Sequence, residues 1–85
     1  MTTEVLSKTI AIVENVLAAN LKATGNKITA SSTMEGMPEW DSLNFINIFL
    51  DVNEAFGIDP EPDDALHYNS ISNIVTFVSK ELTRK

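Results

Sequence analysis

The hydroxyl group of Ser42 stands where this sequence favours contact with a phosphate. Asp41 precedes it and an apolar run follows it, so Ser42 is predicted to open a helix. Backbone N–H groups in a first helical turn have no acceptor within the helix, and they attract negatively charged groups. The carboxylate of Asp41 can cap this turn, which leaves the hydroxyl of Ser42 free. The pattern therefore predicts a favourable place for a phosphate at Ser42.

A hydrolase with Ser42 as its nucleophile is the alternative from enzyme chemistry, and the sequence does not support it. No Gly-x-Ser-x-Gly motif surrounds Ser42, and the single histidine, His67, falls on a separate predicted short helix. The chain has no cysteine, so neither a disulfide nor a zinc–thiolate site is available. Any thiol chemistry must arrive on a cofactor. We predict no catalytic residue and no enzymatic activity.

An acidic segment near the C-terminal third resembles the beginning of a calcium-binding EF-hand loop. Its alternating carboxylates are those of Asp59, Glu61, Asp63 and Asp64. The rest of the loop is missing, because Pro60 and Pro62 interrupt it and Asp64 replaces the turn glycine. Ser70 stands where the bidentate glutamate belongs. We predict no specific metal site, and at most weak, nonspecific binding of divalent cations.

The elements that must position Ser42 begin with an amphipathic helix from Glu4 to about Asn20, and Gly25 can end it. Apolar residues recur in this segment at spacings of four, three and four: Leu6, Ile10, Val13 and Leu17. The segment between Gly25 and Asp41 lacks helical periodicity and reads as a long loop. Four apolar side chains are predicted to pin this loop to the other helices: Ile28, Met34, Met37 and Trp40.

The second helix is predicted from Ser42 to about Phe56, with Gly57 as its C-terminal stop. A short helix capped by Asp63 should reach Tyr68, and the last helix should begin at Asn69-Ser70. The last helix carries the following apolar stripe, which Phe77 flanks: Ile71, Ile74, Val75, Val78 and Leu82. No segment reads as a strand pair. The sequence therefore predicts one all-α domain over residues 1–85. The expected architecture is a small four-helix bundle, with three long helices, one short helix and a long loop between the first two.

Charge limits the classes of partner. The net charge is −6, and the segment from Ile28 to Ser79 holds nine acidic residues with no lysine or arginine. Such a surface repels nucleic acid and anionic membranes, and it attracts basic protein surfaces. No apolar run is long enough to span a bilayer, and the N-terminal residues lack the features of a signal peptide. We expect a cytoplasmic monomer that neither binds nucleic acid nor inserts into a membrane.

With Asp41-Ser42-Leu43 opening the second helix of an acidic chain of 85 residues, the sequence resembles the acyl carrier proteins. The resemblance extends from about Leu6 to Leu82, and its specific part is Trp40 to Leu50 together with Gly57. It implies that Ser42 carries 4′-phosphopantetheine through a phosphodiester. The thiol of this arm would hold an acyl group as a thioester and present it to biosynthetic enzymes.

The resemblance also implies roles for the neighbours of Ser42. In the family, the aspartate before the serine is implicated in binding Mg²⁺ with the phosphopantetheinyl transferase, a role that Asp41 could combine with capping. The docking residues would be Leu43, Ile46, Leu50, Asp51 and Glu54. Ile46 and Leu50 could instead line an acyl pocket. The expected partners, besides the transferase, are an acyl-loading ligase, a synthase or an acyltransferase with a basic docking surface.

Three asparagines depart from the family pattern. Asn44, Asn47 and Asn53 stand on the second helix where many members carry acidic residues. This departure weakens a purely electrostatic docking model and disfavours a housekeeping role in fatty-acid synthesis. The run Trp40-Asp41-Ser42-Leu43-Asn44 looks more like that of stand-alone carriers of specialised pathways. Two alternatives stay open: an aminoacyl or peptidyl carrier that uses the same serine, and an unmodified interaction module with a carrier-like fold.

Overall fold

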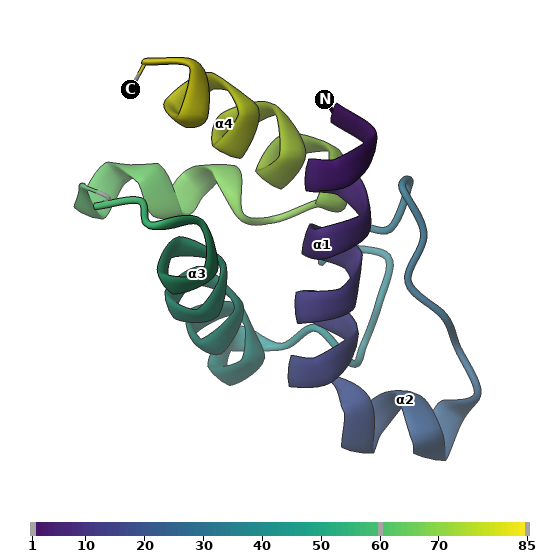
Figure 1. The fold of residues 1–85 in the computed structure, drawn as a ribbon. Helices are drawn as coiled ribbons and strands as arrows, with labels where there is room; N and C mark the ends of the chain where they lie inside the picture. The colour runs from purple at the N-terminus through teal and green to yellow at the C-terminus, as the bar shows by residue number, and fades with distance from the viewer. Residues whose placement is uncertain (1, 60, 85) are drawn as a thin grey trace.

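The computed structural model describes residues 2–59 and 61–84, which form a helical bundle (Figure 1). Its helices are α1 (Thr2–Val16), α2 (Ala18–Thr24), α3 (Ser42–Phe56), the 3-10 helix η1 (Pro62–His67) and α4 (Ile71–Arg84). Over these ranges the fold is all-helical, as predicted, but it has two short helices rather than one. Pro60, which interrupts the calcium-like acidic segment in the sequence, lies outside the described residues.

The first predicted helix is corrected, because it divides at Leu17. The backbone of Leu17 has φ −92° and ψ 6°, between the helical and extended regions. Hydrogen bonds from Leu17 N to Val13 O (2.9 Å) and from Leu21 N to Leu17 O (2.8 Å) nevertheless continue across the bend. The α2 helix has no buried residue, and it turns away from the axis of α1 (Figure 1). It ends at Gly25, whose φ of 78° suits glycine.

The core lies where α1 packs against α3 and α4. Its fully buried apolar side chains are Val13, Leu17, Trp40, Ile48, Val52, Tyr68, Ile71, Ile74 and Val78. On α1 the buried line includes Val5 and Thr9, whereas the predicted Leu6 and Ile10 are only partly buried. Each large apolar side chain that is fully buried contributes about 1.5–3 kcal/mol to folding. This core fixes the position of α3, which carries Ser42.

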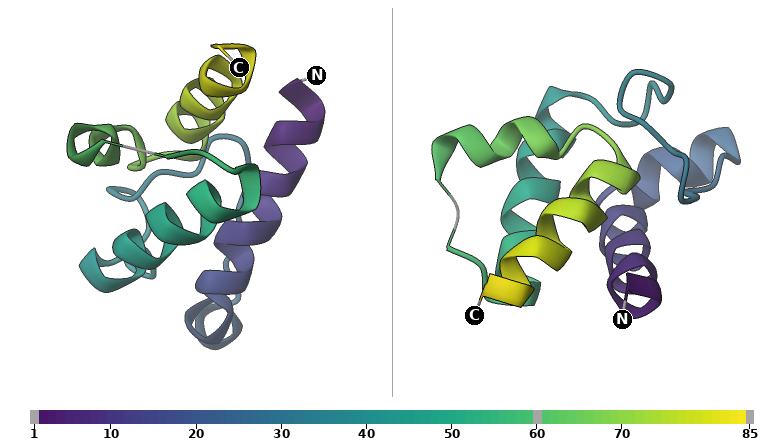
Figure 2. Two further views of the ribbon diagram at one scale, coloured as in Figure 1. Left: turned by 60° about the vertical axis from the view of Figure 1, so that its left-hand side comes forward. Right: turned by 90° about the horizontal axis from the view of Figure 1, so that it is seen from above.

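The long loop between α2 and α3 is held to the bundle as predicted: Ile28, Met37 and Trp40 are buried, and Met34 is partly buried. The loop also pairs with the entry to α4, an arrangement that the sequence did not predict. Met34 N donates to Asn69 O (2.8 Å) and Ile71 N donates to Ser32 O (3.0 Å). The two segments run side by side in Figure 2. One isolated bridge needs no alternating apolar pattern, so no strand signal marks it.

The C-terminal part differs from the prediction in three details. Asp63 is not the cap of the short helix; Glu61 holds that position, and its backbone N–H donates to Asp64 Oδ2 (2.8 Å). Phe77 is buried rather than flanking, and Leu82 is 38% exposed. Across the part of the chain that the structure describes, no helix has the length and apolar character needed to cross a bilayer.

Candidate functional site

Ser42 is the first residue of α3, and its side chain is exposed. Asp41 is the N-cap, with an extended backbone, and its Oδ1 accepts a hydrogen bond from Asn44 N (2.9 Å). Within residues 2–59 and 61–84, the hydroxyl of Ser42 has no hydrogen-bond partner. The N–H groups of Ser42 and Leu43 lie in the first turn, where the helix offers them no acceptor. The structure thus combines a free hydroxyl with an environment that favours a negatively charged group.

The segment before Asp41 is anchored by two buried side chains. Trp40 is fully buried, and Glu39 is only 3% exposed. The hydroxyl of Thr24 and the side-chain amide of Asn26 both donate to Glu39 Oε2. Hydrogen bonds to the charged form, first that from Thr24, lower the pKa of Glu39 below its ordinary value. Sequence reasoning missed Glu39, because nothing local distinguishes a buried glutamate in a loop from an exposed one.

The predicted docking residues lie on the surface of α3. Leu43, Ile46 and Leu50 are 69%, 52% and 57% exposed, and spacings of three and four place them on one face of the helix. Asp51 and Glu54 are also exposed. Exposure of this size places Ile46 and Leu50 outside the core. The structure therefore brings an apolar strip, Leu43, Ile46 and Leu50, together with carboxylates on the helix that begins at Ser42.

A protein-family model described as "Phosphopantetheine attachment site" matches residues 11–78, which include Ser42 and all of α3. The chain belongs to this family. Its members carry 4′-phosphopantetheine covalently on a serine, and such domains are typically carriers without catalytic activity of their own. The family match confirms the resemblance to carrier proteins. Comparison with curated proteins finds no significant match.

Two of the three asparagines that depart from the family pattern have structural roles. Asn53 is buried, and its Oδ1 accepts a hydrogen bond from the hydroxyl of Tyr68 (2.6 Å). Asn44 is partly buried, and its Nδ2 donates to Glu39 O (3.0 Å). Asn47 is the one of the three that is exposed. The missing charge at Asn53 therefore says little about docking, because an acidic side chain there would face Tyr68 rather than a partner.

His67 is exposed on η1. Its ring nevertheless packs, since it stacks on Phe77 with 5.2 Å between ring centroids and 9° between planes. Leu66, its neighbour, is 76% exposed, and the sequence analysis did not single it out. Among the described residues, no group of three or more His, Cys, Asp or Glu side chains is placed to hold a metal ion.

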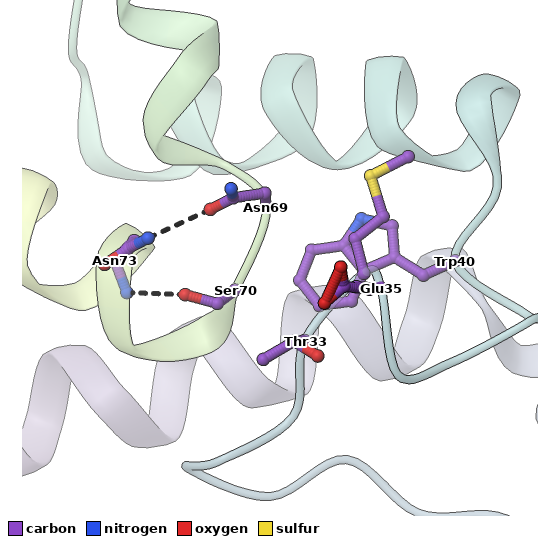
Figure 3. A pocket seen from close by; sticks show the side chains of 7 residues that line it. Thr33, Glu35, Trp40, Asn69, Ser70 and Asn73 are labelled. Atoms are coloured by element: carbon purple, nitrogen blue, oxygen red, sulfur yellow. Dashed lines mark hydrogen bonds between the residues drawn. The ribbon is translucent and has the colours of Figure 1, made fainter.

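A cavity of about 590 Å³ lies between the long loop and the start of α4 (Figure 3). Asn69, Ser70 and Asn73 form one side, where Asn73 Nδ2 donates to Asn69 Oδ1 (2.9 Å). Met34, Glu35 and Trp40 form the other side, and Trp40 lies two residues before Ser42 in the sequence. Thus amide and hydroxyl groups on one side face a carboxylate and the edge of the buried Trp40 on the other.

Proposed function

We propose that this protein is an acyl carrier protein whose 4′-phosphopantetheine arm is attached to Ser42. The observation that carries the proposal is the exposed hydroxyl of Ser42, without a hydrogen-bond partner in the described chain, beside the capping carboxylate of Asp41. The family match over residues 11–78 supports it, because members carry the arm on a serine. The first turn of α3 favours the phosphodiester through its free N–H groups.

The arm and the protein would supply different parts of the carrier chemistry. It has no cysteine, so the arm supplies the thiol on which an acyl group is held as a thioester. Ser42 fixes the root of the arm to α3, and the capped helix keeps that root in one place. A tether of this kind raises the effective concentration of its cargo at whichever enzyme has docked.

Partners would dock on the exposed face of α3. Leu43, Ile46 and Leu50 provide apolar anchors, and Asp51 and Glu54 provide negative charge. A partner with a basic rim around an apolar patch complements this face. We propose a phosphopantetheinyl transferase, which takes the arm from coenzyme A, as one partner. An acyl-loading ligase, a synthase or an acyltransferase would be the next.

The test is transfer of the arm in vitro. The wild-type protein, incubated with coenzyme A and a broad-specificity phosphopantetheinyl transferase, should gain the mass of one arm. Ser42→Ala should keep its helical circular dichroism spectrum and gain no mass, whereas Ser72→Ala, at an exposed serine on α4, should react like the wild type. Absence of modification in the wild type, or modification of Ser42→Ala, would overturn the proposal. Intact mass of the protein from its native host would then identify the cargo.

A further inference from the structure

Glu39 is a buried acidic side chain at the end of the long loop, three residues before Ser42. Its carboxylate accepts hydrogen bonds from Thr24, the last residue of α2, and from Asn26, just beyond α2. Burial of a carboxylate is costly unless donors surround it, and these side chains supply two donors. The other oxygen, Oε1, is buried without a hydrogen-bond partner.

The backbone of Glu39 makes a second set of contacts. Its carbonyl oxygen accepts from Asn44 Nδ2 (3.0 Å), in the first turn of α3, and from Asn20 Nδ2 (3.4 Å), on α2. Asn44 also donates its backbone N–H to Asp41 Oδ1. Ser42 therefore lies between two residues, Asp41 and Asn44, that are tied to each other and through Glu39 to α2.

The two sets of contacts have different consequences for Ser42. The cap formed by Asp41 fixes the conformation of the first turn of α3. Because its hydrogen bond lies within that turn, it does not fix where the turn lies in the molecule. The contacts of Glu39 connect this turn to α2, an element without buried residues of its own, through both the carbonyl and the carboxylate of Glu39. Loss of the carboxylate would remove the hydrogen bonds from Thr24 and Asn26 and leave the segment before Ser42 held to α2 through the carbonyl of Glu39, so the helix start stays intact but is less firmly placed.

From this geometry we infer that Glu39 is a positioning residue for the modification of Ser42. By joining α2 to the first turn of α3, it fixes where the hydroxyl of Ser42 is presented to the transferase. The inference rests on the proposed function, since it concerns the rate at which Ser42 receives its arm. Displacement of a reacting group by about 1 Å can cost on the order of a hundredfold in rate.

The experiment compares Glu39→Ala, Glu39→Gln and Thr24→Val with the wild type in arm transfer from coenzyme A, at a temperature where each is folded. Glu39→Ala should lower kcat by about ten- to a hundredfold, with KM changed by no more than about twofold, because the docking strip on α3 is untouched. Glu39→Gln keeps an acceptor oxygen for Thr24 and should restore most of the rate. Thr24→Val removes one donor and should give an intermediate loss. Glu14→Gln, at an exposed glutamate on α1, is the control and should match the wild type.

A second readout is the fluorescence of Trp40, the single tryptophan of the chain, which adjoins Glu39 and is buried. Its emission should move to longer wavelength in Glu39→Ala as the loop shifts. Folded Glu39→Ala and Thr24→Val proteins with wild-type kcat would overturn the inference, even if their melting temperatures fell. If Glu39→Ala does not fold, Thr24→Val alone decides, because Thr24 is exposed. Failure of the proposed function looks different, since then the wild type itself gains no arm.

Discussion

Asp41 and Ser42 are adjacent, but the structure gives their side chains different tasks. The carboxylate of Asp41 is engaged by the backbone N–H of Asn44, whereas the hydroxyl of Ser42 faces solvent. Exchanging the two residue types would place the reactive group in the cap. The order of this pair therefore matters more than its composition, because only the residue inside the helix start is both exposed and free.

Two roles were considered for Asp41: capping α3, and binding Mg²⁺ with the transferase through its negative charge. Substitutions can separate them. Asp41→Ala removes the cap and should lower the free energy of unfolding by about 1 kcal/mol. Asp41→Asn keeps a capping oxygen and should change stability by less than about 0.5 kcal/mol, because Asn and Asp cap almost equally well. If charge at Asp41 serves the transferase, Asp41→Asn should nevertheless slow arm transfer strongly. Urea unfolding and transfer rates measure the two effects, and a wild-type rate in Asp41→Asn would leave capping as its role.

Tyr68 gives the molecule a defined response to alkali. Burial first, and then the charges of Asp64 and Glu81, raise the pKa of its hydroxyl well above the ordinary value of 10.0. The folded protein thus holds this proton more tightly than the unfolded chain. The resulting stability is fully present below pH 10 and is lost as the pH rises through and beyond that value. Since Tyr68 is the single tyrosine, its near-ultraviolet absorbance reports this ionisation alone.

We expect tyrosinate absorbance and loss of helical circular dichroism to appear together in an alkaline titration. Tyr68→Phe removes the ionisable group, so its stability should fall less steeply with pH above 10. At neutral pH this variant should be less stable by about 1–3 kcal/mol, because Asn53 Oδ1 loses its donor in the core. Ionisation of Tyr68 near pH 10 in a protein that stays fully folded would contradict this prediction.

At the scale of elements, local signals predicted α3 well. The capping Asp41, the apolar run and Gly57, which has φ of 66°, mark both of its ends in the sequence. Features set by tertiary packing were not predictable. The bend at Leu17 lacks a glycine or proline, and the burial of Asn53 depends on Tyr68, which follows fifteen residues later. For the same reason the candidate site was predicted at Ser42, whereas the anchoring of its loop through Glu39 was not.

The docking strip on α3 can be tested with two isoleucines that differ in burial. Ile46 is 52% exposed, whereas Ile48, two positions later on the same helix, is fully buried. Ile46→Ala should weaken transfer to or from a partner by about 1–3 kcal/mol and leave stability almost unchanged. Ile48→Ala should cost about 2–5 kcal/mol in unfolding free energy, because it opens a cavity in the core. Partner kinetics and urea unfolding distinguish the two.

One result of the Ile46→Ala experiment would contradict the prediction that α3 carries a docking strip. If Ile46→Ala destabilised the protein by several kcal/mol while its folded fraction served partners normally, Ile46 would belong to the core. The strip formed by Leu43, Ile46 and Leu50 would then not be a docking surface.

At the scale of the whole molecule, the fold relieves only part of the charge asymmetry of the sequence. Lys8 on α1 reaches the C-terminal end of α3, where its Nζ lies 3.5 Å from Ala55 O and 4.9 Å from the centroid of the Phe56 ring. A cation at a helix C-terminus is favourable. The nine acidic residues between Ile28 and Ser79 still lie close together in a chain of 85 residues. The same negative field that would steer basic partners toward α3 therefore opposes compactness.

Stability should consequently depend on salt. Exposed charges are screened over about 10 Å at 0.1 M ionic strength, so the melting temperature should rise from low to physiological salt. Asp51→Asn removes one exposed negative charge and should reduce this rise, whereas Ser72→Ala should leave it unchanged. A melting temperature that does not respond to salt would mean that the fold already compensates its acidic residues. Melting curves in Mg²⁺ and in NaCl at matched ionic strength complete the test. Identical melting temperatures would indicate screening alone. A higher melting temperature in Mg²⁺ would indicate that the acidic segment Asp59, Glu61, Asp63 and Asp64 binds the cation, because a ligand that binds only the folded state raises its stability.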